Sequence, residues 1–148
     1  MDKKRYVGVA VKHQNKLLLC KRNNLGSFPG MWSIPGGKLE ENETTQEGAK
    51  WEFFEETALN INDVELTFVG LIPRYTRDGK KVKGFMYVYL LNVETPLYPD
   101  LLNAIDGEEH TECGYFTLEE IKPETSGEYF HKLAEIILSW KYYSLFGL

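Results

Sequence analysis

Long apolar runs are missing from this sequence, and their absence excludes one class of protein. No stretch approaches the roughly 20 apolar residues that a membrane-spanning helix needs, so we expect no membrane association. The N-terminal residues, MDKKRYVGV, are charged and lack the apolar stretch and small-residue cleavage site of a signal peptide. These features favour a cytoplasmic protein.

Cysteine is also scarce. Cys20 and Cys113 are the only two, and they lie far apart in the sequence. Their spacing matches neither a metal site nor a disulfide framework, so we expect two reduced thiols, as is usual in the cytoplasm.

An excess of positive charge is missing as well. The chain carries 17 Lys and Arg against 22 Asp and Glu, for a net charge of −5. A general nucleic-acid binder needs a basic footprint, so we expect no polymeric nucleic acid as a partner. A small anionic substrate, held by a metal and a few local cations, remains compatible with this charge.

The sequence contains no internal repeat, low-complexity tract or composition shift that would mark a second domain. A length of 148 residues is enough to bury a proper core. We therefore expect a single domain over residues 1–148.

The pattern of β-branched and apolar residues predicts a mixed sheet with helices. Strands are expected over 6–12, 16–22, 32–35, 64–74 and 81–93, with a late strand near 115. A helix is expected over 44–59, where Thr44 or Thr45 can cap the start and Glu47 lies at capping-box distance from Thr44. Another is expected after Thr125, which lies at capping-box distance from Glu128. Helices on two faces of a mixed sheet give an α/β fold with three layers, an α/β/α sandwich.

Bulky apolar residues recur at helical spacing after Thr125, and we expect this stripe to face the core. The stripe comprises Tyr129, Phe130, Leu133, Ile136, Ile137, Trp140 and Tyr143.

Basic residues cluster around the hairpin turn at Asp78-Gly79. They are Arg74, Arg77, Lys80, Lys81 and Lys83. They are either edge-strand charges that oppose aggregation or a basic rim beside a substrate, and the first interpretation is favoured here.

The predicted helix over 44–59 carries more negative charge than a helix tolerates easily. Glu52 lies three residues before Glu55 and four before Glu56, so the three share one side. Like charges at these spacings destabilise a helix by roughly 0.2–0.5 kcal/mol per pair. A hard divalent cation such as Mg²⁺ reverses this penalty, because it prefers oxygen ligands and shares its shell with water and phosphates.

The spacing of these glutamates resembles the Nudix box. That pattern is Gly, five residues, Glu, seven residues, Arg-Glu-aliphatic, one residue, Glu-Glu, one residue, Gly-aliphatic. The positions that fit are Gly37, Glu43, Glu52, Glu55, Glu56 and Leu59, with Phe53 as a loose match. Trp51 stands where the family has Arg, and Ala58 where it has Gly. The segments LLLCKR and GMWSIPGG before the box also resemble the family.

This resemblance implies a Nudix-type α/β/α sandwich with a mixed sheet, and a set of site residues. Glu52, Glu55 and Glu56 would bind Mg²⁺, with Mn²⁺ as an alternative, and the carbonyl of Gly36 would join them. An acidic loop near the end of many family members supplies one more carboxylate, as metal ligand or general base. Glu112 and then Glu109 are the candidates here, whereas His110 is expected to be a surface loop residue.

Three residues are candidates for substrate binding. Arg22 would contact phosphate, since a guanidinium donates in fork geometry, and Lys38 is a further candidate. Phe28 is either a core residue or a platform for stacking a base. Trp32, close by, is expected to pack in the core.

Clustered carboxylates and a glycine turn, without a cysteine–histidine nucleophile, favour metal-assisted hydrolysis of a phosphoanhydride. By resemblance the substrate is a nucleoside diphosphate linked to a group X. We favour a nucleoside triphosphate, including an oxidised one, cleaved to monophosphate and pyrophosphate by a monomer or homodimer. Nucleotide sugars and dinucleoside polyphosphates are alternatives, as is a nucleotide-binding module without turnover.

The two departures from the box carry separate expectations. In the family the Arg orients a catalytic carboxylate, whereas Trp has one N–H and no charge. Either the loss of Arg reduces activity, or Trp51 is packed in the core beside Phe53 and Phe54 and another residue has taken over the role; the second interpretation is favoured here. Ala58 in a left-handed conformation would cost about 1 kcal/mol, and Asn60 is the residue expected to carry that turn instead.

Overall fold

A seven-stranded mixed sheet forms the centre of the molecule. The structure is a computed structural model that describes residues 4–25, 28–76 and 78–139. The strands are β1 (Lys4–His13), β2 (Lys16–Arg22), β3 (Trp32–Ser33), β4 (Gly36–Lys38), β5 (Thr67–Tyr75), β6 (Val82–Asn92) and β7 (His110–Phe116). β1 and β6 are parallel, and the other pairs are antiparallel. The predicted mixed sheet is therefore confirmed.

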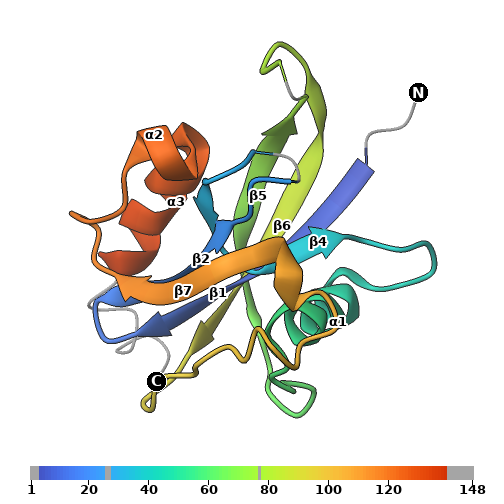
Figure 1. Cartoon of the computed structure of the whole chain (residues 1–148), viewed down its shortest axis with the longest axis vertical. Coiled ribbons are helices and arrows are strands. Elements are labelled where there is room, and N and C mark those ends of the chain that lie inside the picture. The colour runs from blue at the N-terminus through green and yellow to red at the C-terminus, as the bar shows by residue number, and fades with distance from the viewer. Residues whose placement is uncertain (1–3, 26–27, 77, 140–148) are drawn as a thin grey trace.

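Helices cover both faces of this sheet (Figure 1). They are α1 (Thr45–Thr57), the short 3₁₀ helix η1 (Gly107–Glu109), α2 (Pro123–Ser126) and α3 (Glu128–Leu138). One core cluster packs under α1 and a second packs under α3, on opposite sides of β1, β2 and β6. The predicted α/β/α sandwich is confirmed. No helix in the described part of the chain combines the length and apolarity needed to cross a membrane.

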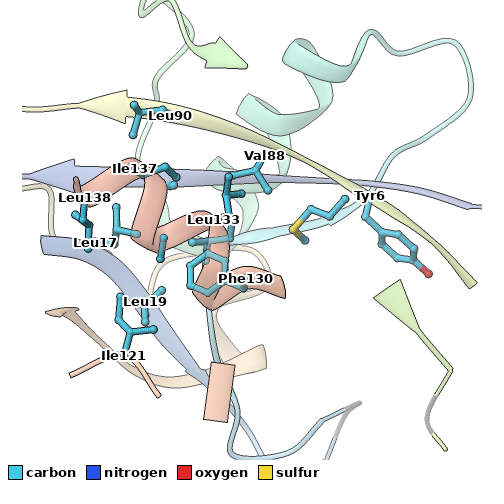
Figure 2. Close-up of a cluster of buried hydrophobic side chains, with 14 residues drawn as sticks. Tyr6, Leu17, Leu19, Val88, Leu90, Ile121, Phe130, Leu133, Ile137 and Leu138 are labelled. Atoms are coloured by element: carbon cyan, nitrogen blue, oxygen red, sulfur yellow. The ribbon is translucent and has the colours of Figure 1, made fainter. Parts of the chain in front are cut away.

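The core cluster under α3 contains the apolar side of that helix. Phe130, Leu133 and Ile137 are buried against the sheet, as their helical spacing predicts. Figure 2 shows Tyr6 at the opposite end of this cluster from Leu138, with its hydroxyl pointing away from the other side chains. The end of the cluster that lies farthest from Leu138 is therefore formed by the aromatic ring of Tyr6.

Other parts of the prediction for this helix were wrong. Tyr129 and Ile136 are 46% and 47% exposed, because a helix of 11 residues turns only one stripe toward the sheet. Thr125 lies in α2 and caps nothing in α3, whose N-cap is Gly127. Trp140 and Tyr143 lie outside the described residues.

Helix α1 begins with the predicted cap and ends with an unexpected one. The Glu47 N–H donates to Oγ1 of Thr44 over 3.1 Å, and that hydroxyl donates to the Glu47 carboxylate over 2.7 Å. At the other end Ala58 adopts the left-handed conformation, with φ of 63°, and its N–H donates to the Phe54 carbonyl. The expectation that Asn60 carries this turn was wrong.

Trp51 is on the outer side of α1. It is 47% exposed, and its ring centroid lies 5.7 Å from that of Phe54. The helix buries Ala49 and Phe53 instead. Position 51 is two residues from each, on the opposite side of a helix with 3.6 residues per turn. The prediction that Trp51 packs in the core was therefore wrong.

The two cysteines are joined. β2 and β7 pair so that Cys20 lies opposite Cys113, with 4.0 Å between their Cα atoms, and the sulfur atoms form a disulfide. The prediction of two reduced thiols was wrong, because 93 residues separate the cysteines in sequence and only the strand pairing brings them together.

Strands β1 and β2 separate soon after their hairpin, and this separation positions the site. Their register is confined to two residue pairs next to the turn, Lys12 with Leu17 and His13 with Lys16. Farther along, β1 pairs with β4, whereas β2 pairs with β3 and β7. Gly36 and Gly37 of β4, and Arg22 at the end of β2, therefore lie where β1 and β2 have separated.

Candidate active site

The carboxylates of α1 meet the glycine turn of β4. The N–H of Gly36 donates to Oε1 of Glu56 over 2.8 Å. Oε1 of Glu52 lies so close to Gly37 that a side chain at this position would collide with it. Gly36 in turn lies against Val7 and Gly8 of β1, where a Cβ would strike backbone atoms. Gly36 is therefore required by the close approach of backbone, whereas a side chain at position 37 would displace the Glu52 carboxylate.

A loop after β6 docks on the end of α1 and adds more acidic residues. The N–H of Asp106 donates to the Glu55 carbonyl over 2.7 Å, and the N–H of Asp100 donates to the Thr57 carbonyl over 2.8 Å. These bonds satisfy two carbonyls that the end of a helix leaves unpaired. As a result the side chains of Asp106 and Glu109 lie near the carboxylates of α1. The charge of Asp106 raises the pKa of Glu55, and the charges of Glu109 and Asp106 raise the pKa of Glu56.

Burial and mutual repulsion hold several of these carboxyl groups toward their neutral form. Burial raises the pKa of Glu56 to about 8, and the charge of Glu109 adds to the shift while Arg22 opposes it. Burial also raises the pKa of Glu52, and the hydrogen bond and charge of Glu55 raise it further. Burial is also the main reason that the pKa values of Glu55 and Glu109 are raised. The cluster is therefore short of positive charge.

The donor set of this cluster fits a hard divalent cation. Carboxylate and carbonyl oxygens are the ligands that Mg²⁺ takes from proteins. The Gly36 carbonyl points to the same side of its strand as the Gly36 N–H, which is the side of Glu56. Within the described residues, no three acidic side chains already converge as a ligand set. Glu52 and Glu55 instead share a hydrogen bond, which a bound cation would replace.

Arg22 and His110 face one another across the ends of β2 and β7. Arg22 acts electrostatically on Glu56, Glu109 and His110, so it lies beside the acidic cluster. His110 is only 5% exposed, and burial lowers its pKa to about 4. The expectation that His110 is a surface residue was wrong.

A cavity of about 450 Å³ opens beside Arg22, away from the acidic cluster. Aromatic side chains from four parts of the chain line it, namely Phe28, Trp32, Tyr75, Tyr129 and Phe130. Arg74 and Glu128 also line it, and the rest of the lining includes apolar side chains from β5 and β6. A mostly apolar cavity of this size with a few charged groups is typical of a small-molecule site.

The comparisons with known proteins agree with this geometry. The family model described as NUDIX domain matches residues 2–134. The chain belongs to the Nudix family. The structure of a MutT NUDIX hydrolase from Burkholderia pseudomallei has the same fold, with a TM-score of 0.71 and 19% identity, over 90% of this chain and 96% of that one.

Curated relatives share higher identity over shorter segments. The m7GpppN-mRNA hydrolase NUDT17 of Xenopus laevis is 41% identical over 93 residues, which are 57% of this chain and 31% of that protein. The 8-oxo-dGTP diphosphatase of Proteus vulgaris is 33% identical over 69 residues, 45% of this chain and 62% of that protein. The match therefore spans about a third of the first relative and less than two thirds of the second.

The Nudix fold brings most of the predicted site residues together, but separates two of them from the rest. Glu56 is bonded to Gly36 and Glu52 to Glu55 in the second half of α1, without converging as a ligand set in the described residues, and Arg22 and Phe28 line the cavity. Lys38 is exposed at the end of β4, outside the cavity lining. Glu112 is exposed on β7 opposite Lys21, whereas Glu109 faces the acidic cluster.

Sequence reasoning missed Asp106 and misjudged Arg74. Nothing local marks Asp106, because its role depends on how the loop docks on α1. Arg74 was assigned to edge-strand charge, but it is partly buried and lines the cavity. The alternation of β5 was a usable signal, because Arg74 is two residues from Ile72, which packs on the core beneath α3.

Proposed function

We propose that this Nudix protein hydrolyses a nucleoside diphosphate linked to a group X, most simply a nucleoside triphosphate, including an oxidised one. The products would be a nucleoside monophosphate and pyrophosphate. The observation that supports this is the position of the acidic cluster beside Arg22 and an aromatic cavity of about 450 Å³. A substrate with a chain of phosphates and an aromatic base matches this order of groups.

Four groups would hold a divalent cation, Mg²⁺ or Mn²⁺: the carboxylates of Glu52, Glu55 and Glu56 and the carbonyl of Gly36. When bound, the cation would neutralise negative charge on the phosphates and lower the pKa of a water molecule that it binds. The Gly36 N–H keeps Glu56 aimed at the turn, so this carboxylate is preorganised.

A further carboxylate would take the proton of the attacking water. The water oxygen bonds to phosphorus, the bridging P–O bond breaks, and the released phosphate group leaves with the bonding electrons. Glu109 suits the base role because it faces the cluster and because burial raises its pKa toward neutrality. Asp106 would hold Glu55 through their side-chain hydrogen bond.

The substrate would extend from the cluster into the cavity. Arg22 would contact phosphate, since it acts electrostatically on Glu56 and also lines the cavity. Phe28 lines the cavity and would stack on the base. Lys38 would contact only phosphates outside the cavity. The substrate is a small nucleotide, not a polymeric nucleic acid or a membrane, and the protein would act as a monomer or a homodimer.

The test is phosphate and pyrophosphate release from a nucleotide panel with Mg²⁺, using the parent and Glu56→Gln. Removing a hard anionic ligand while keeping its shape should lower turnover at least a hundredfold and leave the fold intact. Glu65→Gln, at an exposed residue outside the cluster, is the matched control and should keep full activity. Full activity of Glu56→Gln at ordinary Mg²⁺ concentrations would show that the site is misplaced.

Trp51 favours a second candidate, a nucleotide-binding module without turnover. It is 47% exposed and packs beside Phe54, so it offers no charge to orient Glu52 as the family's Arg does. The same panel separates the two, provided that it includes nucleotide sugars and dinucleoside polyphosphates. Binding without release of phosphate from any member would favour the module.

A further inference from the structure

The guanidinium of Arg74 lines the cavity, and few groups of the protein offset its positive charge. Its guanidinium carbon lies 4.9 Å from the centroid of the Tyr6 ring, which is itself only 9% exposed. The guanidinium lies over this ring, which Figure 2 shows at the end of the core cluster. A cation over such a ring is attracted by the negative face of its π-system.

No anion of the protein pairs with this guanidinium. In the ranges 4–25, 28–76 and 78–139, no carboxylate lies within 4.0 Å of it and no acceptor takes a hydrogen bond from it. Burial and the charge of Arg22 both lower its pKa, while Glu56 acts on it in the opposite direction. Buried charges in proteins are normally paired, because desolvation is costly. An anion from outside would supply the missing partner.

The order of charges indicates which anion this is. Arg22 acts electrostatically on both Glu56 and Glu109, whereas of these two carboxylates only Glu56 acts on Arg74, and both arginines line the cavity. A nucleotide whose cleaved bond lies at the acidic cluster and whose base lies among the aromatic side chains passes Arg22 and then Arg74. The phosphate that reaches Arg74 is the one attached to the nucleoside.

We propose that Arg74 binds the phosphate nearest the nucleoside, the group that stays on the monophosphate product. A planar guanidinium donates two parallel hydrogen bonds to phosphate oxygens, and the Tyr6 ring lies beside this one. This assignment rests on the proposed function for the direction of the substrate. Arg74 is therefore a substrate-binding residue that contributes to product affinity as well as to substrate affinity.

The test measures binding of nucleoside monophosphates and of the matching uncharged nucleosides to metal-free protein by calorimetry. Four bases are used, because the base is not assigned. Arg74→Met should weaken monophosphate binding at least tenfold and leave nucleoside binding within twofold. Arg74→Lys should restore part of the loss, because it keeps the charge without the fork. Lys83→Met is the matched control, since Lys83 lies over the same ring at 5.5 Å but does not line the cavity.

Kinetics add an independent readout if the parent turns over substrate. Arg74 touches a phosphate that is bound in both the ground state and the transition state, so Arg74→Met should raise KM about tenfold with kcat within threefold. A purely structural role would instead lower the melting temperature and affect nucleosides equally. Arg74→Gln serves as the second variant if Arg74→Met does not fold.

Three results would overturn the assignment. They are unchanged monophosphate binding in a folded Arg74 variant, an equal loss for nucleosides and monophosphates, and no monophosphate binding by the parent at millimolar concentration. The second of these would mean that Arg74 contacts the base if the melting temperature is unchanged, and that its role is structural if the melting temperature falls. None requires turnover, so a failure of the proposed hydrolysis is distinguishable from a failure of this site.

Discussion

At the scale of single residues, Ala58 holds a backbone conformation that glycine adopts without cost. Its φ of 63° ends α1 in the left-handed region, where a Cβ meets the following carbonyl. We expect Ala58→Gly to stabilise the protein by about 1 kcal/mol, which corresponds to a rise of about 2–4 °C in Tm. Differential scanning calorimetry gives this value directly.

The control for Ala58→Gly is the same substitution inside the helix. Ala49 is buried in the middle of α1, so Ala49→Gly should destabilise the protein by about 1 kcal/mol or more. A lower Tm for Ala58→Gly would mean that the end of α1 is held by tertiary contacts that prefer alanine.

The two loop carboxylates can be separated by one matched pair of substitutions. Glu109 faces the acidic cluster, whereas Glu112 is exposed opposite Lys21. If Glu109 accepts the proton of water, Glu109→Gln should lower kcat on the order of a hundredfold, and Glu112→Gln should stay within twofold. Steady-state kinetics on the best substrate of the panel decide this. The reverse ranking would restore the order that the sequence favoured.

At the scale of elements, the disulfide joins two strands that carry different parts of the site. Cys20 is two residues before Arg22 on β2, and Cys113 is three residues after His110 on β7. The bond closes a loop over a sequence separation of 93 residues. Cross-links of this kind typically add about 2–4 kcal/mol, chiefly through the unfolded chain.

We expect the double variant Cys20→Ala, Cys113→Ala to lose about this much free energy of unfolding, and reductant to do the same to the parent. Urea denaturation with and without reductant measures both. The double variant should not respond to reductant, which makes it the internal control. Equal midpoints for the parent in both conditions would mean that the bond contributes nothing to stability.

Local patterns predicted the elements better than the contacts between them. The cap at Thr44, the strand ranges and the spacing of Glu52, Glu55 and Glu56 depend on neighbours within a few residues, and the structure has the corresponding cap, strands and helix face. The Cys20–Cys113 pairing and the docking of Asp106 on α1 depend on strand order and loop path, which no local pattern encodes.

Burial was misjudged where a residue type suggests one environment and the fold supplies another. Trp51 is apolar yet lies on the outer side of α1, and Tyr129 lines the cavity mouth beside Tyr75. Arg74 and His110 are polar yet turned inward. Three of these four residues border the proposed site, where binding a ligand favours exposed aromatic rings and incompletely compensated charge.

At the scale of the whole molecule, the acidic cluster links stability to pH. Burial raises the pKa of Glu56 from 4.5 to about 8 in the folded state. Between these two values the folded protein binds more protons than the unfolded chain, so the free energy of unfolding falls as pH rises. The raised pKa values of Glu52, Glu55 and Glu109 act in the same direction.

We therefore expect the metal-free protein, in EDTA, to have a higher Tm at pH 6 than at pH 8. Saturating Mg²⁺ should raise Tm at both values, and more at pH 8, because it binds the ionised carboxylates of the folded state alone. Glu56→Gln should reduce both the pH dependence and the response to Mg²⁺, whereas Glu65→Gln should change neither. Thermal melts in matched buffers measure all four quantities. Identical midpoints with EDTA and with saturating Mg²⁺ at pH 8 would show that the cluster binds no metal, and the proposed hydrolysis would then lose its chemical basis.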